Sequence, residues 1–145
     1  MTTVSGIIEN IIDYLNYNKS SSLPTIRFDM LSVKDDSCCI TTANQELNEH
    51  LADVTGMWAE GTIKLKVMYR QLVNVKGIDE LQLLDIVDSL VDMIVQNYKS
   101  IYEGAEDWFI DRVSDVQPAK LERVYQNSCK DFSSTLVITY NRKVK

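Results

Sequence analysis

The chain has 145 residues, a length typical of one domain that buries a sizeable core and too short for two comfortable ones. Apolar residues make up 45% of it and charged residues 25%, with five Gly and two Pro, so the composition is that of a soluble, folded protein rather than a disordered one. Fifteen Lys and Arg against 21 Asp and Glu give a formal net charge of -6. Because such a charge repels phosphate backbones, it argues against a protein that reads nucleic-acid sequence.

Cysteine usage indicates a reducing compartment. The three cysteines are Cys38, Cys39 and Cys129, an odd number with one adjacent pair and no CxxC spacing. This pattern predicts reduced thiols. The amino-terminal segment lacks the positive flank and unbroken apolar run of a signal peptide, and no apolar run approaches the ~20 residues that a membrane span needs. The sequence therefore predicts a protein that is made and kept in a cytoplasm, with no membrane partner.

The first predicted element is an amphipathic helix over residues 3–17. Its apolar residues recur at spacings of three and four, which places them on one stripe of a helix: Val4, Ile7, Ile8, Ile11, Ile12 and Leu15. Thr3 or Ser5 is the expected amino-terminal cap, because a hydroxyl oxygen there accepts a hydrogen bond from a free backbone N–H. The polar segment that follows ends at Pro24, so the helix stops before it.

Two short strands are predicted next, at residues 26–30 and in the run CCITT, and together they have the pattern of a hairpin. Apolar residues in the first strand alternate with Arg27 and Asp29, and the segment LSVKDDS supplies turn residues between the two strands. Residues 43–61 carry a weak signal and are predicted as a long excursion, with a turn or two of helix in ELNEHLADV as the alternative. Long ordered loops often carry binding residues.

Residues 62–71, TIKLKVMYRQ, predict a strand with two different faces. Side chains alternate along a strand, so the apolar residues Ile63, Leu65, Val67 and Tyr69 share one face. The other face carries Lys64, Lys66 and Arg70, which we call the basic strip. A solvated outer face of a half-covered sheet is one interpretation of this strip, and a contact surface for another molecule is the second.

A long helix is predicted over residues 78–101, where Asp79 and Gln82 have the form of a capping box. Its apolar face is formed by Leu81, Leu84, Val87, Val91, Ile94 and Tyr98, widened by Leu83, Ile86, Leu90 and Met93. We expect this face to cover the apolar side of strand 62–71. The opposite face carries Asp85, Asp88 and Asp92, which we call the acidic stripe. This stripe is interpreted as a solvated surface, a site for a hard cation, or a contact for a basic strip on a neighbouring copy.

Strand signals return after Gly104. The segment DWFIDRVSDVQP predicts a short strand ending near Pro118, AKLERVYQ alternates weakly, and DFSSTLVITYNR predicts a strand with four apolar residues on one side: Phe132, Leu136, Ile138 and Tyr140. Helices and strands are partly segregated along the chain. The sequence therefore predicts one α+β domain over residues 1–145, with a largely antiparallel or mixed sheet of four to six strands and its two main helices on one face.

The sequence contains no recognisable catalytic constellation. His50 is the only histidine, and a metal site needs several ligands of suitable type. A nucleophilic role for Cys38 or Cys39 is an open alternative, but the nearby Asp35 and Asp36 disfavour a thiolate. No glycine-rich phosphate loop and no GxSxG turn is present. We therefore expect no enzyme activity, no catalytic residue, no cofactor and no metal, and a binding or structural role.

The order of elements resembles that of the tail-terminator proteins of long-tailed bacteriophages, a group also described as minor capsid or tail-completion proteins. The resemblance runs over most of the chain. It includes the amino-terminal helix GIIENIIDYL, a strand pair, the strand GTIKLKVMYR, the helix DELQLLDIVDSLVDMI, the proline-containing connection DVQPAKL and the closing strand FSSTLVITY.

This resemblance implies a virion protein of the tail or neck, assembled in the host cytoplasm. Its subunits form a homo-oligomeric ring, usually of six, that stops polymerisation of the tail tube and docks to the head–tail connector while DNA passes through the lumen without specific binding. Another neck or head-completion component and a small cytoplasmic adaptor or regulator remain as alternatives. A ring subunit needs two different, complementary surfaces. The predicted interface residues are Lys64, Lys66, Arg70, Asp85, Asp88 and Asp92.

Overall fold

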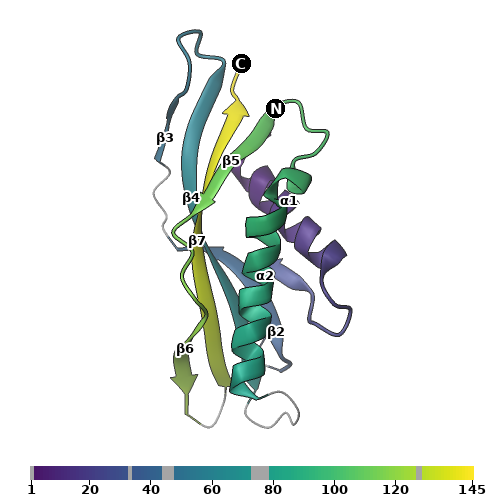
Figure 1. Ribbon diagram of the computed structural model, residues 1–145. Coiled ribbons are helices and arrows are strands. Elements are labelled where there is room, and N and C mark those ends of the chain that lie inside the picture. The colour runs from purple at the N-terminus through teal and green to yellow at the C-terminus, as the bar shows by residue number, and fades with distance from the viewer. Residues whose placement is uncertain (1, 33, 44–47, 73–78, 127–128) are drawn as a thin grey trace.

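The structure is a computed structural model that describes residues 2–32, 34–43, 48–72, 79–126 and 129–145. Its elements are, in order, α1 (Val4–Asn18), β1 (Ile26–Phe28), β2 (Ser37–Thr42), β3 (Asn48–Leu51), β4 (Trp58–Leu72), α2 (Glu80–Ile101), β5 (Trp108–Ser114), β6 (Lys120–Tyr125) and β7 (Cys129–Lys143). Both helices lie on the same side of a mixed sheet (Figure 1). The α+β prediction is confirmed, but the described residues form seven strands rather than four to six.

Two long antiparallel strands organise the sheet. β4 and β7 have 15 residues each and pair along their whole length, from Trp58 opposite Lys143 to Leu72 opposite Cys129. On its other side β4 carries β2 and β3 end to end, and β7 carries β5 and β6 in the same way. β1 then joins β2. Because each long strand holds two short ones, the sheet contains more strands than the sequence pattern suggested.

The predicted hairpin between residues 26–30 and CCITT is wrong in its direction. Both strands form, but β1 and β2 run parallel, with Ile26 opposite Cys38 and Phe28 opposite Ile40. Asp29 has a positive φ of 56° and begins the turn. Since β1 has only three residues, a short connection is enough to bring the chain back to the start of β1.

The segment predicted as a long excursion is largely a hairpin. Residues 44–47 lie outside the described residues, while β3 pairs antiparallel with β4, which begins at Trp58 rather than at residue 62. The helical alternative is wrong for residues 48–51, because backbone pairing with β4 overrides a weak local signal. Residues 48–62 project beyond the ends of the helices (Figure 1). We call this hairpin the finger.

The amino-terminal caps of both helices are among the residues predicted from the sequence. The backbone N–H of Gly6 donates to Thr3 Oγ1 at 3.0 Å, so Thr3 rather than Ser5 is the cap of α1. At the start of α2 the backbone N–H of Gln82 donates to Asp79 Oδ1 at 2.8 Å, and the backbone N–H of Asp79 donates to Gln82 Oε1 at 3.2 Å. The predicted capping box is therefore confirmed.

The predicted packing of α2 on strand 62–71 is also confirmed. One hydrophobic cluster joins the apolar side of β4 (Ile63, Leu65, Val67, Tyr69), the buried face of α2 (Leu83, Val87, Leu90, Val91, Ile94) and the inner side of β7 (Phe132, Leu136, Ile138, Tyr140). Leu81 is an exception, because its side chain is 73% exposed. It lies two residues before the buried Leu83 and thus about 200° around the helix from it. Because residues of α1, β1, β2 and β5 join the same core, the chain forms a single domain.

Gly61 provides a test of the packing where the finger meets β7. A Cβ atom at this position would lie 2.5 Å from the hydroxyl oxygen of Tyr140, whose side chain is fully buried. We expect Gly61→Ala to lower the free energy of unfolding by about 1–3 kcal/mol, the usual cost of overpacking, measured by urea denaturation. Gly6→Ala is the control, since its Cβ would meet only the Thr2 and Thr3 side chains at 3.3–3.4 Å, and it should change stability by less than about 0.5 kcal/mol. Equal stabilities of Gly61→Ala and wild type would show that the Tyr140 contact is not tight.

Candidate functional site

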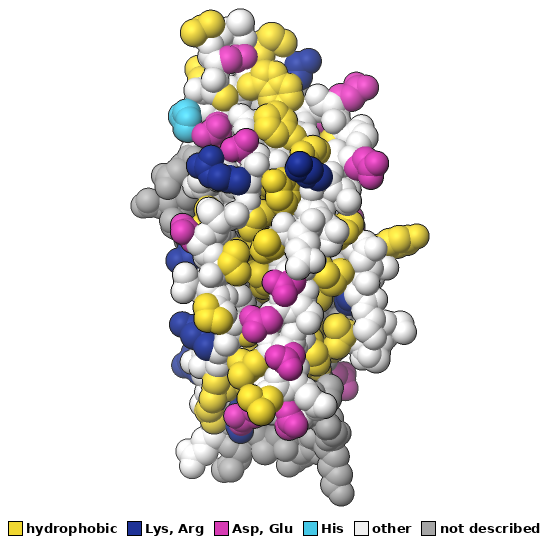
Figure 2. Space-filling view, in the orientation of Figure 1, with side chains coloured by type: hydrophobic (Ala, Val, Ile, Leu, Met, Phe, Trp, Pro, Cys, Tyr) yellow, Lys and Arg dark blue, Asp and Glu magenta, His cyan; other side chains and the backbone are white. Residues whose placement is uncertain are grey.

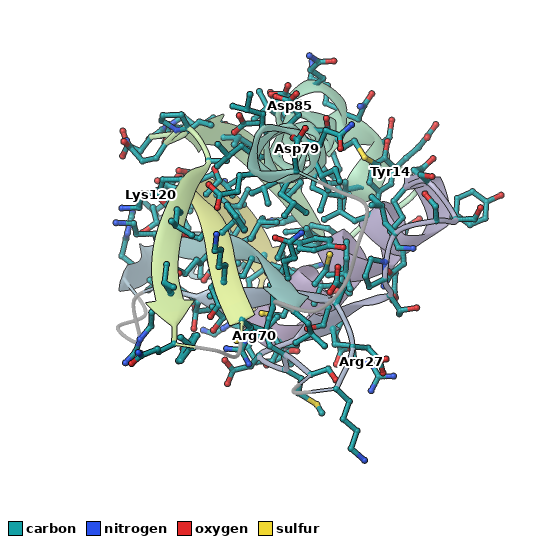
Figure 3. All side chains as sticks on the ribbon, turned by 90° about the horizontal axis from the view of Figure 1, so that it is seen from below. Tyr14, Arg27, Arg70, Asp79, Asp85 and Lys120 are labelled. Atoms are coloured by element: carbon teal, nitrogen blue, oxygen red, sulfur yellow. The ribbon has the colours of Figure 1, made fainter. Side chains whose placement is uncertain are left out.

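The basic strip lies on the face of the sheet that the helices do not cover, and Figure 3 shows Arg70 on the opposite side of the molecule from Asp85. Two of its three cations already have partners within the domain. Lys66 forms an ion pair with Glu122 of β6, and Arg70 forms a bidentate pair with Asp131 of β7, at 2.7 and 2.9 Å. Lys64 is exposed and forms no ion pair with any described residue. The strip therefore offers one unpaired cation to another molecule.

Arg70 is held as part of the sheet surface. Its guanidinium lies 5.2 Å from the ring centre of Tyr125, and the guanidinium of Arg123 lies 4.9 Å from the same ring. Asp131 is 2% exposed, and its hydrogen bonds raise the pKa of Arg70 above the ordinary value. The cation and the aromatic ring attract each other. Arg70 is thus fixed by both the Asp131 carboxylate and the Tyr125 ring.

The acidic stripe is only partly available for contact. Asp88 Oδ1 accepts a hydrogen bond of 2.8 Å from the backbone N–H of Ala119, which ties α2 to the connection between β5 and β6. Asp85 and Asp92 are exposed, and their carboxylates form no ion pair with any described residue. Figure 2 shows a row of acidic side chains along α2, with apolar side chains on either side of it. Two of the three predicted acids are therefore open to a partner.

The cysteines are poorly suited to nucleophilic chemistry. Cys38 and Cys39 are 1% and 3% exposed, and burial raises the pKa of Cys38 to about 12 and that of Cys39 to about 11. Cys129 is also buried. At neutral pH the Cys38 and Cys39 thiols hold their protons, and a protonated thiol is a weak nucleophile.

The single histidine is exposed and has a carboxylate beside it. The side chain of His50 is 70% exposed and lies 3.9 Å from Glu60. Across the described ranges, no group of three or more His, Cys, Asp or Glu side chains is arranged to hold a metal ion. No helix in these ranges has the length and apolar character of a membrane span.

The tip of the finger is an ordered turn that displays apolar side chains. The Asp53 carboxylate accepts hydrogen bonds from Thr55 Oγ1 at 2.9 Å and from the backbone N–H of Met57 at 3.1 Å, which holds the turn in one shape. These bonds lower the pKa of Asp53, and the bond from Thr55 is the largest cause. Leu51 is 64% exposed, Val54 fully exposed and Met57 38% exposed. All three belong to the outer end of the finger, and contiguous exposed apolar surface is typical of a contact site.

The base of the finger is tied to β7 by an ion pair. Glu49 accepts hydrogen bonds from Arg142 Nη2 at 2.7 Å and Nε at 2.9 Å, and from the hydroxyl of Tyr140 at 2.5 Å. The bonds from Arg142 are the main reason that the pKa of Glu49 is lowered. The ion pair fixes the direction in which the finger projects from the sheet.

A cleft opens between the carboxyl-terminal end of α1 and the middle of α2. Its volume is about 460 Å³. The apolar wall is formed by Leu23, Ile86, Leu90 and Met93, and Lys19 and Asp85 lie at the same cleft. We call it the α1–α2 cleft. Its size falls within the roughly 300–1,000 Å³ that is usual for binding pockets.

Sequence reasoning found the charged faces but missed the finger tip and the cleft. The cleft joins residues that are far apart in the chain, so periodicity within one element does not reveal it. The segment DVTG, with its Asp, Thr and Gly, is a turn signal that identifies the tip of a hairpin.

Comparison with protein-family models finds no model that matches the chain, and comparison with curated proteins finds no match either.

The two internal ion pairs of the basic strip differ in burial and should differ in their effect on stability. Asp131→Ala leaves the Arg70 guanidinium, 15% exposed, without its carboxylate, so we expect a loss of about 3 kcal/mol in the free energy of unfolding. Glu122→Ala is the matched control, because Lys66 and Glu122 are each about a quarter exposed. It should cost less than about 1 kcal/mol. Equal losses in urea denaturation would contradict this assignment of a buried and a surface pair.

The finger base should make stability depend on pH in the acid range. The pKa of Glu49 is lower in the folded chain than in the unfolded chain, where it is about 4.3. Glu49 therefore stabilises the fold above that pH, and this contribution is lost as the pH falls through the lowered value. We expect Glu49→Gln to be less stable than wild type at pH 7 and to approach it near pH 3. Glu103→Gln, at an exposed position, should follow the wild-type profile. A constant difference between Glu49→Gln and wild type from pH 7 to pH 3 would contradict this role.

Proposed function

We propose that the chain is a structural virion protein, a tail terminator that forms a ring of six subunits at the head-proximal end of a phage tail tube. In this proposal the ring stops polymerisation of the tube and docks to the head–tail connector. The order of elements, which resembles that of tail terminators over most of the chain, supports the proposal. The structural observation that carries it is that the domain has exposed groups of opposite charge on two different surfaces, with Lys64 on β4 and Asp85 and Asp92 on α2.

Two unlike surfaces favour head-to-tail contacts between copies. A contact between identical patches produces a dimer, whereas a contact between different patches produces a ring when the rotation closes. The basic strip and the acidic stripe are such a pair. Because Lys66 and Arg70 are neutralised within the subunit, the electrostatic part of the contact depends on Lys64. One exposed ion pair contributes about 0.2–1 kcal/mol, so a stable ring also needs apolar contacts.

The charge distribution is also compatible with a lumen through which DNA passes without binding. A lumen rich in unpaired Lys and Arg would hold phosphates at low salt. Here the formal net charge is -6, and Lys66 and Arg70 are both paired with carboxylates. Within the basic strip, only Lys64 is therefore left to neutralise phosphates.

We propose a structural rather than a catalytic role for the three cysteines. All three are buried, and the raised pKa values of Cys38 and Cys39 keep these two thiols protonated at neutral pH. The exposed chemistry of the domain is instead that of contact: charged rows, an apolar tip and an apolar cleft.

Electron microscopy tests the proposal directly. The purified protein is imaged alone and after mixing with tail tubes, and we expect rings of uniform diameter that sit at tube ends and stop further elongation. Lys64→Glu should reduce the fraction of protein in rings several-fold, measured in parallel by light scattering, whereas Lys34→Glu, at an exposed position in the connection before β2, should not. Tubes that elongate to the same length with and without the protein would overturn the terminator function.

A further inference from the structure

We infer that the finger of one copy of this chain docks in the α1–α2 cleft of a second copy. The inference deepens the proposed function, since it names the apolar contact between neighbouring subunits. It rests on the head-to-tail association of copies, but not on the identity of the tube or the connector.

The apolar parts of the two surfaces are complementary in form. Val54 stands fully exposed at the finger tip, with Leu51 and Met57 exposed beside it. The α1–α2 cleft is a concave site with an apolar wall formed by Leu23, Ile86, Leu90 and Met93. Apolar side chains that fill a pocket near the centre of an interface provide most of its binding free energy. One convex and one concave apolar surface on the same domain fit a contact between copies.

The charges around these surfaces are complementary as well. Asp53 lies in the turn at the finger tip. The Lys145 ammonium is also close to this turn, because it lies 3.7 Å from the position that a Cβ on Gly56 would occupy. The cleft carries one charge of each sign, Lys19 and Asp85. Docking can therefore pair Asp53 with Lys19 of the second copy, and Lys145 with its Asp85. Such pairs align the two copies and exclude other partners.

The finger and the cleft of one molecule are too far apart to meet. The finger projects from one end of the domain, whereas α1 and α2 lie well away from its tip (Figure 1). The contact is therefore between molecules, and it is head to tail because the two surfaces differ. The finger includes the first part of β4, the strand that carries Lys64. Docking thus brings the start of β4 of one copy close to α2 of the next, where the acidic stripe lies.

Association through the β1 edge of the sheet is less suitable. The side-chain amide of Asn16 donates to the carbonyl oxygen of Ile26 at 2.9 Å, and its oxygen accepts from the backbone N–H of Ile26 at 2.8 Å. These bonds occupy both backbone groups of Ile26, so an added strand could not pair with that residue. Contact through side chains at the finger and the cleft does not require this edge.

Cysteine cross-linking tests the contact without requiring a known partner. Val54→Cys places a thiol on the finger tip and Ser89→Cys places one at the exposed side of the cleft, while the three native cysteines are buried. With a short bismaleimide, we expect a covalent dimer when the two variants are mixed and none from either variant alone. Val116→Cys, 42% exposed on the connection between β5 and β6, replaces Ser89→Cys as the control and should give no dimer with Val54→Cys.

The other cross-linking results would each overturn the inference. A dimer from Val54→Cys alone indicates contact between two fingers, and a dimer from Ser89→Cys alone indicates a symmetric contact through α2. No dimer in any mixture leaves the cleft to a different occupant.

Rings in the microscope without the mixed cross-link would reject this contact but keep the terminator function. The cross-link without any effect on tube length would keep the contact and reject that function.

Weakening of self-association provides an independent measurement. Val54→Asp should raise the dissociation constant about tenfold or more in sedimentation, because it places a carboxylate against the apolar wall of the cleft. Val116→Asp is the matched control and should leave the constant unchanged. Asp85→Lys and Lys145→Glu should each weaken association, and association should recover when both are present in every copy. Failure of the double variant to recover would contradict the proposed charge pairing.

Discussion

The pairing of β4 with β7 is the constraint on which the rest of the structure depends. The two strands are in register over 15 residues each, and all the other strands except β1 pair directly with one of them. Since side chains alternate with a period of two, this single register sends Leu65 and Leu136 into the core and Lys64 and Val137 to the outer face. A slip by one residue would exchange the two faces along the whole length of the domain.

The same register decides how much positive charge the outer face presents. Arg70 lies directly opposite Asp131, so the most buried cation of the strip is neutralised across the central strand pair. Lys66 reaches further, over β7 to Glu122 on β6. A strand that looks strongly basic by itself therefore keeps one unpaired cation, Lys64, once its neighbours are in place. For this reason a charge pattern in one strand is a poor guide to the charge of a sheet face.

Elements with a strong internal period could be predicted from the sequence, and those defined by contacts with distant residues could not. Both helices, the capping box at Asp79 and the core of β4 follow from spacing within one segment. The parallel pairing of β1 and the strand β3 depend on partners elsewhere in the chain. The exposed position of Leu81 depends on which side of a wide apolar stripe meets the sheet. The interface role of the six predicted residues stays a prediction, and the partners of Lys66, Arg70 and Asp88 within the domain appear only in the folded structure.

Closure of the proposed ring requires a finger that is held in one direction. In a head-to-tail ring each contact repeats the same rotation, so a small error in angle is multiplied by the number of subunits and turns a ring into an open helix. A loosely attached hairpin would leave that rotation undefined. Here the ion pair between Glu49 and Arg142 fixes the base of the finger, and the backbone N–H of Val144 donates to the carbonyl oxygen of Met57 near its tip. β7 and the residue after it therefore support the finger at both its base and its tip, so the long strand pair that builds the core also sets the direction of the proposed contact.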